Sequence, residues 1–174
     1  TEMIVWGGYD VNYVNTGARY DPVTDYWRST TLTNAPAGRY QHTAVWTGTH
    51  MAVWGGYNGS GYLQGGGLYD PVNNTWMPMS TVDAPDARYL HTAVWTGDLM
   101  VVWGGYDSST YLDTGGRYDP ATDIWTPITA VGVPTARYLH TAVAADGDMV
   151  IWGGYGNSGA LNSGARYDAA FDTW

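Results

Sequence analysis

The sequence Arg88-Tyr-Leu-His-Thr-Ala-Val-Trp95, followed by Met100-Val-Val-Trp-Gly-Gly105, recurs in near-copies along the chain at one fixed interval. Residues 39–87 and 88–136 are identical at 28 of 49 positions, and a third copy starts at Arg137. The 174 residues therefore hold about 3.5 units of 49 residues. A unit of this size cannot bury its own apolar face, so the repetition indicates an array of stacked units.

Each full unit predicts four short antiparallel strands, which in one copy span residues 39–46, 51–56, 66–69 and 75–77. Thr96-Gly97 after the first strand and Tyr118-Asp-Pro120 after the third are typical of tight turns. The two remaining connections are longer, and because strand directions alternate, both emerge on one face. No sustained helical periodicity is present. Short strands on a repeat of about 40 to 50 residues are typical of propeller blades.

The order of hydrophobic residues, Gly-Gly, and then a spaced Tyr and Trp resembles the kelch repeat. The resemblance covers the whole chain and implies an all-β, kelch-type β-propeller with four-stranded antiparallel blades. It implies full blades at 39–76, 88–125 and 137–174, and an incomplete blade at 1–27 that lacks its innermost strand. The elements that keep register in every unit are the Gly pairs 7–8, 55–56, 104–105 and 153–154 and the outer-strand residues Trp27, Trp76, Trp125 and Trp174.

The Gly-Gly pairs end the second strand of each unit. Two glycines weaken a strand unless another group must come close to the backbone. We therefore expect the outer-strand tryptophans to lie over the Gly-Gly pairs, in the space that the missing side chains leave.

The number of blades is lower than in most kelch rings, so closure of the ring needs an explanation. Three explanations remain open: a fragment of a longer repeat protein, a homo-oligomer that closes a ring from several chains, or a four-bladed ring with one three-stranded blade. We favour the fragment, because copies this similar indicate recent amplification.

Composition excludes several classes of function. The net charge is −9 and the chain has no lysine, which argues against a nucleic-acid partner. The absence of cysteine excludes a disulfide framework, a thiolate nucleophile and the Tyr-Cys copper site of galactose oxidase, a kelch enzyme. No apolar run reaches the length of about 18 residues that a membrane span needs. Abundant Gly, Asp, Asn, Thr, Trp and Tyr favours an extracellular or cell-surface protein.

One arginine stands at the start of the first strand in each full unit, at the end of the blade from which the long loops emerge. These residues are Arg39, Arg88 and Arg137. In a ring they could bind carboxylate ligands in a bidentate way. The alternative is that each arginine pairs with an Asp or with loop carbonyls and pins its blade.

The long loop after each Gly-Gly pair combines tyrosines with small polar residues, a mixture typical of adaptable contact surfaces. Tyr57 and its equivalents directly after Gly-Gly are expected to pack between blades. The better candidates for contact with a protein or a glycan are Tyr62 and Tyr111, with Asn58 and Asp107 beside them.

One histidine also recurs in the first strand of each full unit, as His42, His91 and His140. These imidazoles could converge on a metal ion, or each could make the same structural hydrogen bond in its own blade. We expect the structural role, and we expect neither a metal nor a cofactor.

The sequence thus predicts a non-catalytic kelch scaffold that binds a protein or a carbohydrate through its loop face. Two other functions remain open. The chain could be the propeller part of a secreted carbohydrate-active enzyme whose catalytic groups lie elsewhere, or a structural repeat module of an oligomeric or surface assembly.

Overall fold

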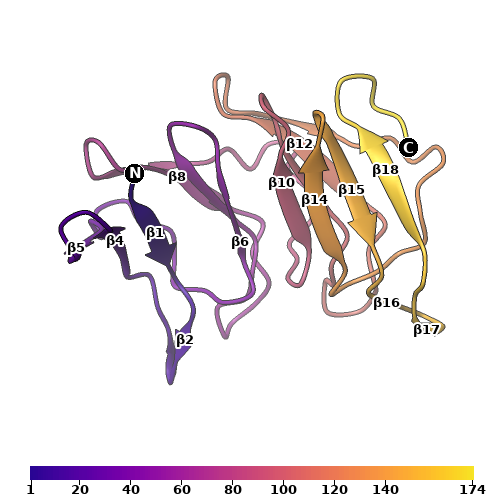
Figure 1. Cartoon of the computed structure of the whole chain (residues 1–174). Helices are drawn as coiled ribbons and strands as arrows, with labels where there is room; N and C mark the ends of the chain where they lie inside the picture. The colour runs from indigo at the N-terminus through magenta and orange to yellow at the C-terminus, as the bar shows by residue number, and fades with distance from the viewer.

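The computed structural model describes residues 1–174 and contains strands, turns and loops but no helix, so no helix of the chain could cross a membrane. Four antiparallel sheets, here called the first to fourth blades, follow one another along the chain (Figure 1). The first blade consists of β1 (Met3–Trp6), β4 (Gly17–Asp21) and β5 (Tyr26–Ser29). The second consists of β6 (Thr43–Trp46), β7 (Met51–Trp54), β8 (Gly66–Asp70) and β9 (Thr75–Pro78).

The third blade repeats this plan with β10 (Thr92–Trp95), β11 (Met100–Trp103), β12 (Gly115–Asp119) and β13 (Ile124–Pro127). The fourth contains β14 (Thr141–Ala145), β15 (Asp148–Trp152) and β18 (Gly164–Asp168), and Thr173 pairs with Asp168 through a single bridge where an outer strand would run. Two small hairpins lie in the long loops of the end blades: β2 (Tyr9–Asp10) with β3 (Asn12–Tyr13), and β16 (Tyr155–Gly156) with β17 (Gly159–Ala160).

The innermost strands are shorter than the sequence predicts. β6 begins at Thr43 rather than at Arg39, because Gln41 has a φ of 55° and breaks the extended backbone. Leu90 and Leu139 occupy the same position in the next two blades with φ values of 57° and 54°. An L-residue in this region ends regular pairing, so the Arg-Tyr-x-His segment forms a bent entry to the strand.

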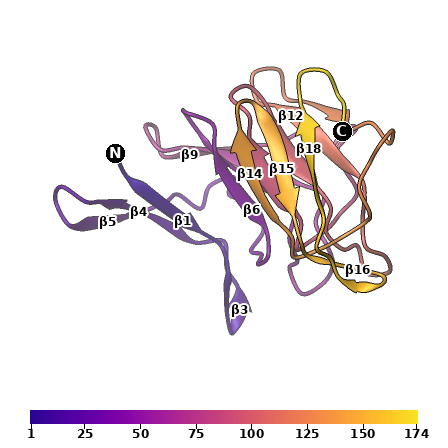
Figure 2. The same ribbon diagram turned by 45° about the vertical axis from the view of Figure 1, so that its right-hand side comes forward.

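The blades stand side by side, and the innermost strands of the second, third and fourth blades are in contact. β10 contacts β6 on one side and β14 on the other, and the two views in Figures 1 and 2 show the first and fourth blades at opposite ends of the array. Three clusters of buried side chains occupy the seams between neighbouring blades. The stability of each blade therefore depends on its neighbour, as in other repeat proteins.

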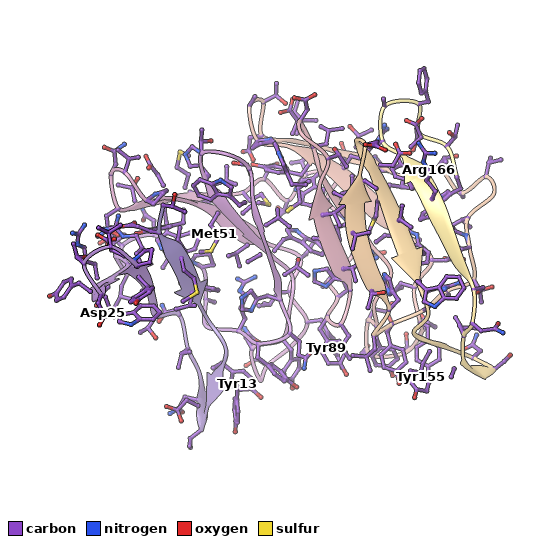
Figure 3. The ribbon with its side chains drawn as sticks, in the orientation of Figure 1. Tyr13, Asp25, Met51, Tyr89, Tyr155 and Arg166 are labelled. Atoms are coloured by element: carbon purple, nitrogen blue, oxygen red, sulfur yellow. The ribbon has the colours of Figure 1, made fainter.

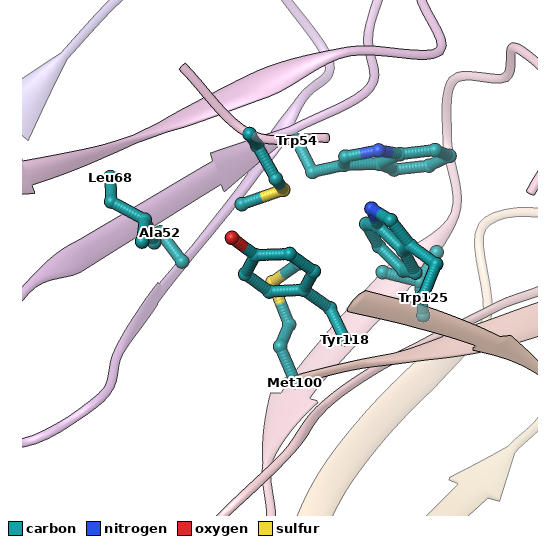
Figure 4. Close-up of a cluster of buried hydrophobic side chains, with 8 residues drawn as sticks. Ala52, Trp54, Leu68, Met100, Tyr118 and Trp125 are labelled. Atoms are coloured by element: carbon teal, nitrogen blue, oxygen red, sulfur yellow. The ribbon is translucent and has the colours of Figure 1, made fainter. Parts of the chain in front are cut away.

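The central seam shows how the cluster is built. Trp125 and Tyr118 of the third blade face Trp54 and Leu68 of the second (Figure 4). The rings of Trp125 and Trp54 are 5.4 Å apart, and those of Trp125 and Tyr118 are 5.0 Å apart. Tyr118 and Trp125 are also cross-strand neighbours in the register of β12 and β13, which fixes their side-by-side placement.

The outer-strand tryptophans do not lie over the Gly-Gly pairs, so this expectation was wrong. Trp125 lies over Gly116 of the third strand, where an added Cβ would be 3.1 Å from Trp125 Cε3. Gly67 and Trp76 have the same relation in the second blade. Residues 116 and 125 belong to adjacent strands of one sheet, so the Trp125 ring needs a glycine within its own blade. The Gly-Gly pairs of the first three blades instead contact the next blade, as described below.

The first blade leaves one strand edge without a partner. β1 pairs with β4 alone, whereas its counterpart β7 pairs with β6 on one side and β8 on the other. A hollow of about 530 Å³ lies beside this edge, lined by Ile4 from β1 and by Val45 and Trp46 from β6. Trp46 is consequently 49% exposed.

Two tryptophans with different surroundings test the packing of the seams. Trp125→Ala should lower the free energy of unfolding by about 3–5 kcal/mol, because Trp125 is 2% exposed and its loss leaves a cavity between two blades. Trp46→Ala, the matched control on the rim of the hollow, should cost less than about half of that. Urea denaturation followed by circular dichroism measures both values. Equal losses for the two variants would contradict the seam packing.

Candidate functional site

The joint between neighbouring blades is built from a histidine that enters the space left by the first glycine of a Gly-Gly pair. A Cβ added to Gly104 would be 2.6 Å from Cε1 of His140 in the next blade, and Gly104 has a φ of 69°. The His140 ring lies 5.2 Å from the Trp103 ring at an angle of 75°, and its Nε2 is 2.7 Å from Thr92 Oγ1. His91 meets Gly55, Trp54 and Thr43 in the same way. Only glycine permits this approach.

The second glycine of the pair fixes the backbone across the same joint. Gly105 N donates a hydrogen bond of 2.8 Å to Arg137 O of the next blade. A Cβ on Gly105 would also lie 2.8 Å from Tyr89 O of its own blade. Gly8 and Gly56 donate equivalent bonds of 2.7 and 2.8 Å to Arg39 O and Arg88 O. The Gly-Gly pairs of the first three blades therefore each connect one blade to the next.

The three arginines are buried beneath this joint and bind backbone carbonyls. Arg88 is 0% exposed; its Nε donates to Asp86 O at 2.8 Å, and its Nη1 donates to Gly104 O at 3.1 Å and Thr114 O at 2.7 Å. Burial lowers the pKa of Arg88 to about 10, so the guanidinium still carries its charge at neutral pH.

Arg39 and Arg137 repeat these contacts. Arg39 donates to Ala37 O, Gly55 O and Gly65 O, and Arg137 donates to Thr135 O, Gly153 O and Ser163 O. This geometry supports the second of the two roles expected from the sequence, in which each arginine pins its blade through loop carbonyls. The three arginines are 0 to 4% exposed, and the binding surface described below is built without them.

The three histidines lie in three successive seams, where His42 packs against Trp6 as His91 and His140 pack against their own tryptophans. Burial, followed by the nearby Arg39 or Arg137 charge, lowers the pKa of His42 and of His140 to about 4. Burial also lowers the pKa of His91 well below its usual value. The structure contains no group of three or more His, Cys, Asp or Glu side chains arranged to hold a metal ion.

A continuous row of tyrosines, here called the tyrosine belt, crosses all four blades on the face of the long loops. Figure 3 marks three of its members, Tyr13, Tyr89 and Tyr155, along the lower edge of the array. Neighbouring rings are 4.9 to 6.4 Å apart. The ten members are Tyr9, Tyr13, Tyr40, Tyr57, Tyr62, Tyr89, Tyr106, Tyr111, Tyr138 and Tyr155.

Backbone pairing sets the spacing of the belt within a blade. Tyr57 forms bridges with Tyr40 on one side and Tyr62 on the other, and Tyr106 pairs with Tyr89 and Tyr111 in the same way. Directly paired residues project to the same side of a sheet, so the three rings of a blade lie next to one another. The belt then continues across a seam where Tyr62 meets Tyr89, with ring centres 4.9 Å apart.

The repeat architecture matches a known protein family. The family model described as the KLHDC2/KLHL20/DRC7 Kelch-repeats domain matches residues 1–132 and 68–174. The chain belongs to the kelch-repeat family. Its antiparallel sheets are blades of a kelch β-propeller, a scaffold on which other kelch proteins commonly bind proteins. A comparison with curated proteins gives no significant match.

Two residues singled out in the sequence lie at the seams of this kelch belt. Tyr111 stacks on Tyr138 of the next blade with an interplanar angle of 11°, and Tyr62 packs on Tyr89 at 51°. Both side chains are partly exposed. Tyr57, expected to pack between blades, lies in the same belt, and its hydroxyl donates to Gly59 O at 3.0 Å within its own loop.

Asn58 and Asp107 shape the kelch loops that carry these tyrosines. Asn58 Oδ1 accepts hydrogen bonds from the backbone N–H groups of Ser60 and Gly61, each at 3.0 Å. Asp107 Oδ1 accepts from the N–H groups of Ser109 and Thr110, and hydrogen bonds to Thr110 and Ser109 hold the pKa of Asp107 below its usual value. These side chains order the loop from within and remain partly exposed.

The sequence reasoning missed three members of the belt, Tyr40, Tyr89 and Tyr138. Each directly follows the recurring arginine, so the repeated Arg-Tyr pair was the available signal. The bend at Gln41, Leu90 and Leu139 removes this tyrosine from the regular strand and places it beside the loop. The sequence predicted a regular strand over residues 39–46, and a tyrosine within such a strand is not expected to lie beside the long loop.

The joint can be tested at two glycines of the third blade that both have positive φ. Gly104→Ala should lower the free energy of unfolding by about 2–4 kcal/mol, because strain adds to the overlap with His140. Gly97→Ala, the control, has a φ of 113° but no atom within 4 Å of an added Cβ, so strain alone should cost about 1–2 kcal/mol. Chemical denaturation measures the difference between them. Equal losses would show that the space at Gly104 does not matter.

Proposed function

We propose that this kelch chain is a non-catalytic scaffold that binds a protein partner through the tyrosine belt. The observation that carries the proposal is the continuity of ten partly or largely exposed tyrosines across four blades, on the face where the long loops lie. Single exposed aromatic residues are common on any surface, but a contiguous patch of this kind is typical of interaction sites.

The chemistry of the belt suits a protein surface. Tyrosine offers a large ring and a hydroxyl at a low cost in side-chain entropy, which is why it is frequent in binding loops. Packing of neighbouring rings further limits the motion of each side chain before any partner binds. Burial and the neighbouring tyrosine Tyr62 raise the pKa of Tyr89 above its usual value, so its hydroxyl stays neutral and can both donate and accept.

The charge of the chain favours a basic partner. The net charge is −9, and exposed carboxylates flank the belt in the long loops, at Asp10, Asp86 and Asp113. Arginine and lysine of a partner could pair with these acids and lie over tyrosine faces.

A glycan is the less favoured partner. Stacking on a sugar needs a free aromatic face, and Tyr111, one of the two residues expected to make such contact, has one face covered by Tyr138 at 4.9 Å. Rings within the belt are mostly tilted against one another and present edges and hydroxyl groups, which serve hydrogen bonding to a polypeptide better than stacking on a flat sugar.

A random dodecapeptide library displayed on phage, selected on the immobilised chain, tests this proposal. We expect enriched peptides that carry Arg or Lys and that bind the wild type. The double variant Tyr62→Ser/Tyr111→Ser should weaken their binding at least about tenfold, because it opens the belt at two seams. Biolayer interferometry with the synthetic peptides measures the dissociation constants.

Tyr26→Ser is the matched control, since Tyr26 is an exposed tyrosine of β5 outside the belt. It should leave peptide binding unchanged, and circular dichroism should show that all variants remain folded. Peptides that bind the double variant as tightly as the wild type would contradict the proposal. A selection that enriches no peptide would also contradict it, as would selective binding of the chain to glycans on an array.

A further inference from the structure

The two ends of the array expose the two halves of a seam that is complete three times inside the chain. In each internal seam the outer-strand tryptophan of one blade meets the second-strand tryptophan of the blade before it. Their ring centres are 5.3, 5.4 and 5.2 Å apart in the pairs Trp76–Trp6, Trp125–Trp54 and Trp174–Trp103.

The remaining two tryptophans of these types lie at opposite ends and have no such partner. Trp27 of β5 in the first blade is 47% exposed, whereas its counterpart Trp125 is 2% exposed. Trp152 of β15 in the fourth blade is 59% exposed, whereas its counterpart Trp103 is 0% exposed. One end therefore offers the outer-strand indole of the pair, and the other end offers the second-strand indole.

The surrounding apolar residues follow the same division. In the seam between the third and fourth blades, Val94 packs in one cluster with Met149 and Ile151. Their equivalents at the two ends are Val143 on the fourth blade and Met3 and Val5 on the first, and all three are exposed. We call the surface of Val143 and Trp152 the trailing face, and the surface of Met3, Val5 and Trp27 the leading face.

An ion pair of the seam between the third and fourth blades has a counterpart of each of its halves at the ends of the array. Arg117 of the third blade donates to Ala169 O at 3.0 Å, and its Nη2 is 3.7 Å from Asp172 Oδ2 of the fourth blade. The equivalent arginine on the trailing side is Arg166, and the equivalent acid on the leading side is Asp25. Figure 3 shows Asp25 and Arg166 at opposite ends of the array, and both side chains are exposed.

Arg166 forms an ion pair with Asp148 of its own blade, and this pair does not prevent a contact with another blade. Arg19 gives the precedent: it lies 3.7 Å from Glu2 of its own blade while it donates a hydrogen bond to Pro71 O of the next. A guanidinium has five donors, enough for both partners.

We propose that a second copy of this chain docks head to tail, its leading face on the trailing face of the first copy. The contact reproduces the outer half of an internal seam, with Trp152 against Trp27, Val143 against Met3 and Val5, and Arg166 against Asp25. It lacks the histidine joint, because the first blade has no innermost strand. The interface is heterologous, and the same contact made twice by two copies closes a particle of two chains.

Analytical ultracentrifugation of the 174-residue chain over a wide range of concentration tests the docking. We expect reversible association to a particle of twice the chain mass of 18.9 kDa. Trp27→Ala and Trp152→Ala should each weaken association at least about tenfold, because each removes one indole from both contacts of the particle. A chain that stays monomeric at every concentration would overturn the proposal.

Charge reversal separates head-to-tail docking from other self-association. Arg166→Asp alone and Asp25→Arg alone should each impair association, because every contact then brings like charges together. An equal mixture of the two variants should recover it, since the mixed pair contains one native and one reversed ion pair. Asp98→Arg, on an exposed hairpin turn of the third blade, is the control and should associate like the wild type. A mixture that associates no better than its components would refute the head-to-tail arrangement.

Discussion

The contact on which the rest of the structure depends is the imidazole of one blade in the space that the first glycine of a Gly-Gly pair leaves at the end of the preceding blade. It appears at Gly7 with His42, at Gly55 with His91 and at Gly104 with His140. A buried arginine beneath each joint holds the loop carbonyls in place, and the carbonyl of the same residue accepts the bond from the second glycine. Because each joint uses groups from two blades, neither blade can complete it alone.

The separation between buried seam residues and exposed tyrosines explains where binding can occur. The joint and the tryptophan clusters occupy the interior of the seams, and the arginines and histidines that recur in the three full units lie there; all are buried except His42, which is partly exposed. The tyrosines lie outside the joint, on the bent entry to the innermost strand and in the long loops. The tyrosines occupy the same positions in successive blades. Because the seams hold the blades at a regular spacing, the rings form a regular row. A partner that spans several blades would meet repeated chemistry, as is common for repeat scaffolds.

The sequence was sufficient for the features that depend on periodicity. The all-β fold and the kelch family follow from the recurrence of Gly-Gly, Tyr and Trp, and both are confirmed. The sequence did not show which side chain packs against each glycine. Residues 104 and 140 are far apart in the chain, and a pattern within one unit cannot show that a histidine of the next unit fills the gap. The tryptophans were therefore placed over the wrong glycines, and Gly116 was overlooked. The bend at Gln41 was equally hidden, since glutamine gives no signal for a positive φ.

The state of the buried imidazoles tests this account most directly. In an NMR titration of the folded chain, the Hε1 signals of His91 and His140 should not move between pH 7 and about 5, because burial keeps the pKa of His140 at about 4 and that of His91 well below its usual value. In concentrated urea the chain is unfolded, and the same signals should titrate at about pH 6.5. Titration of both histidines near that pH in the folded chain would show that the imidazoles are in solvent, and would contradict the joint.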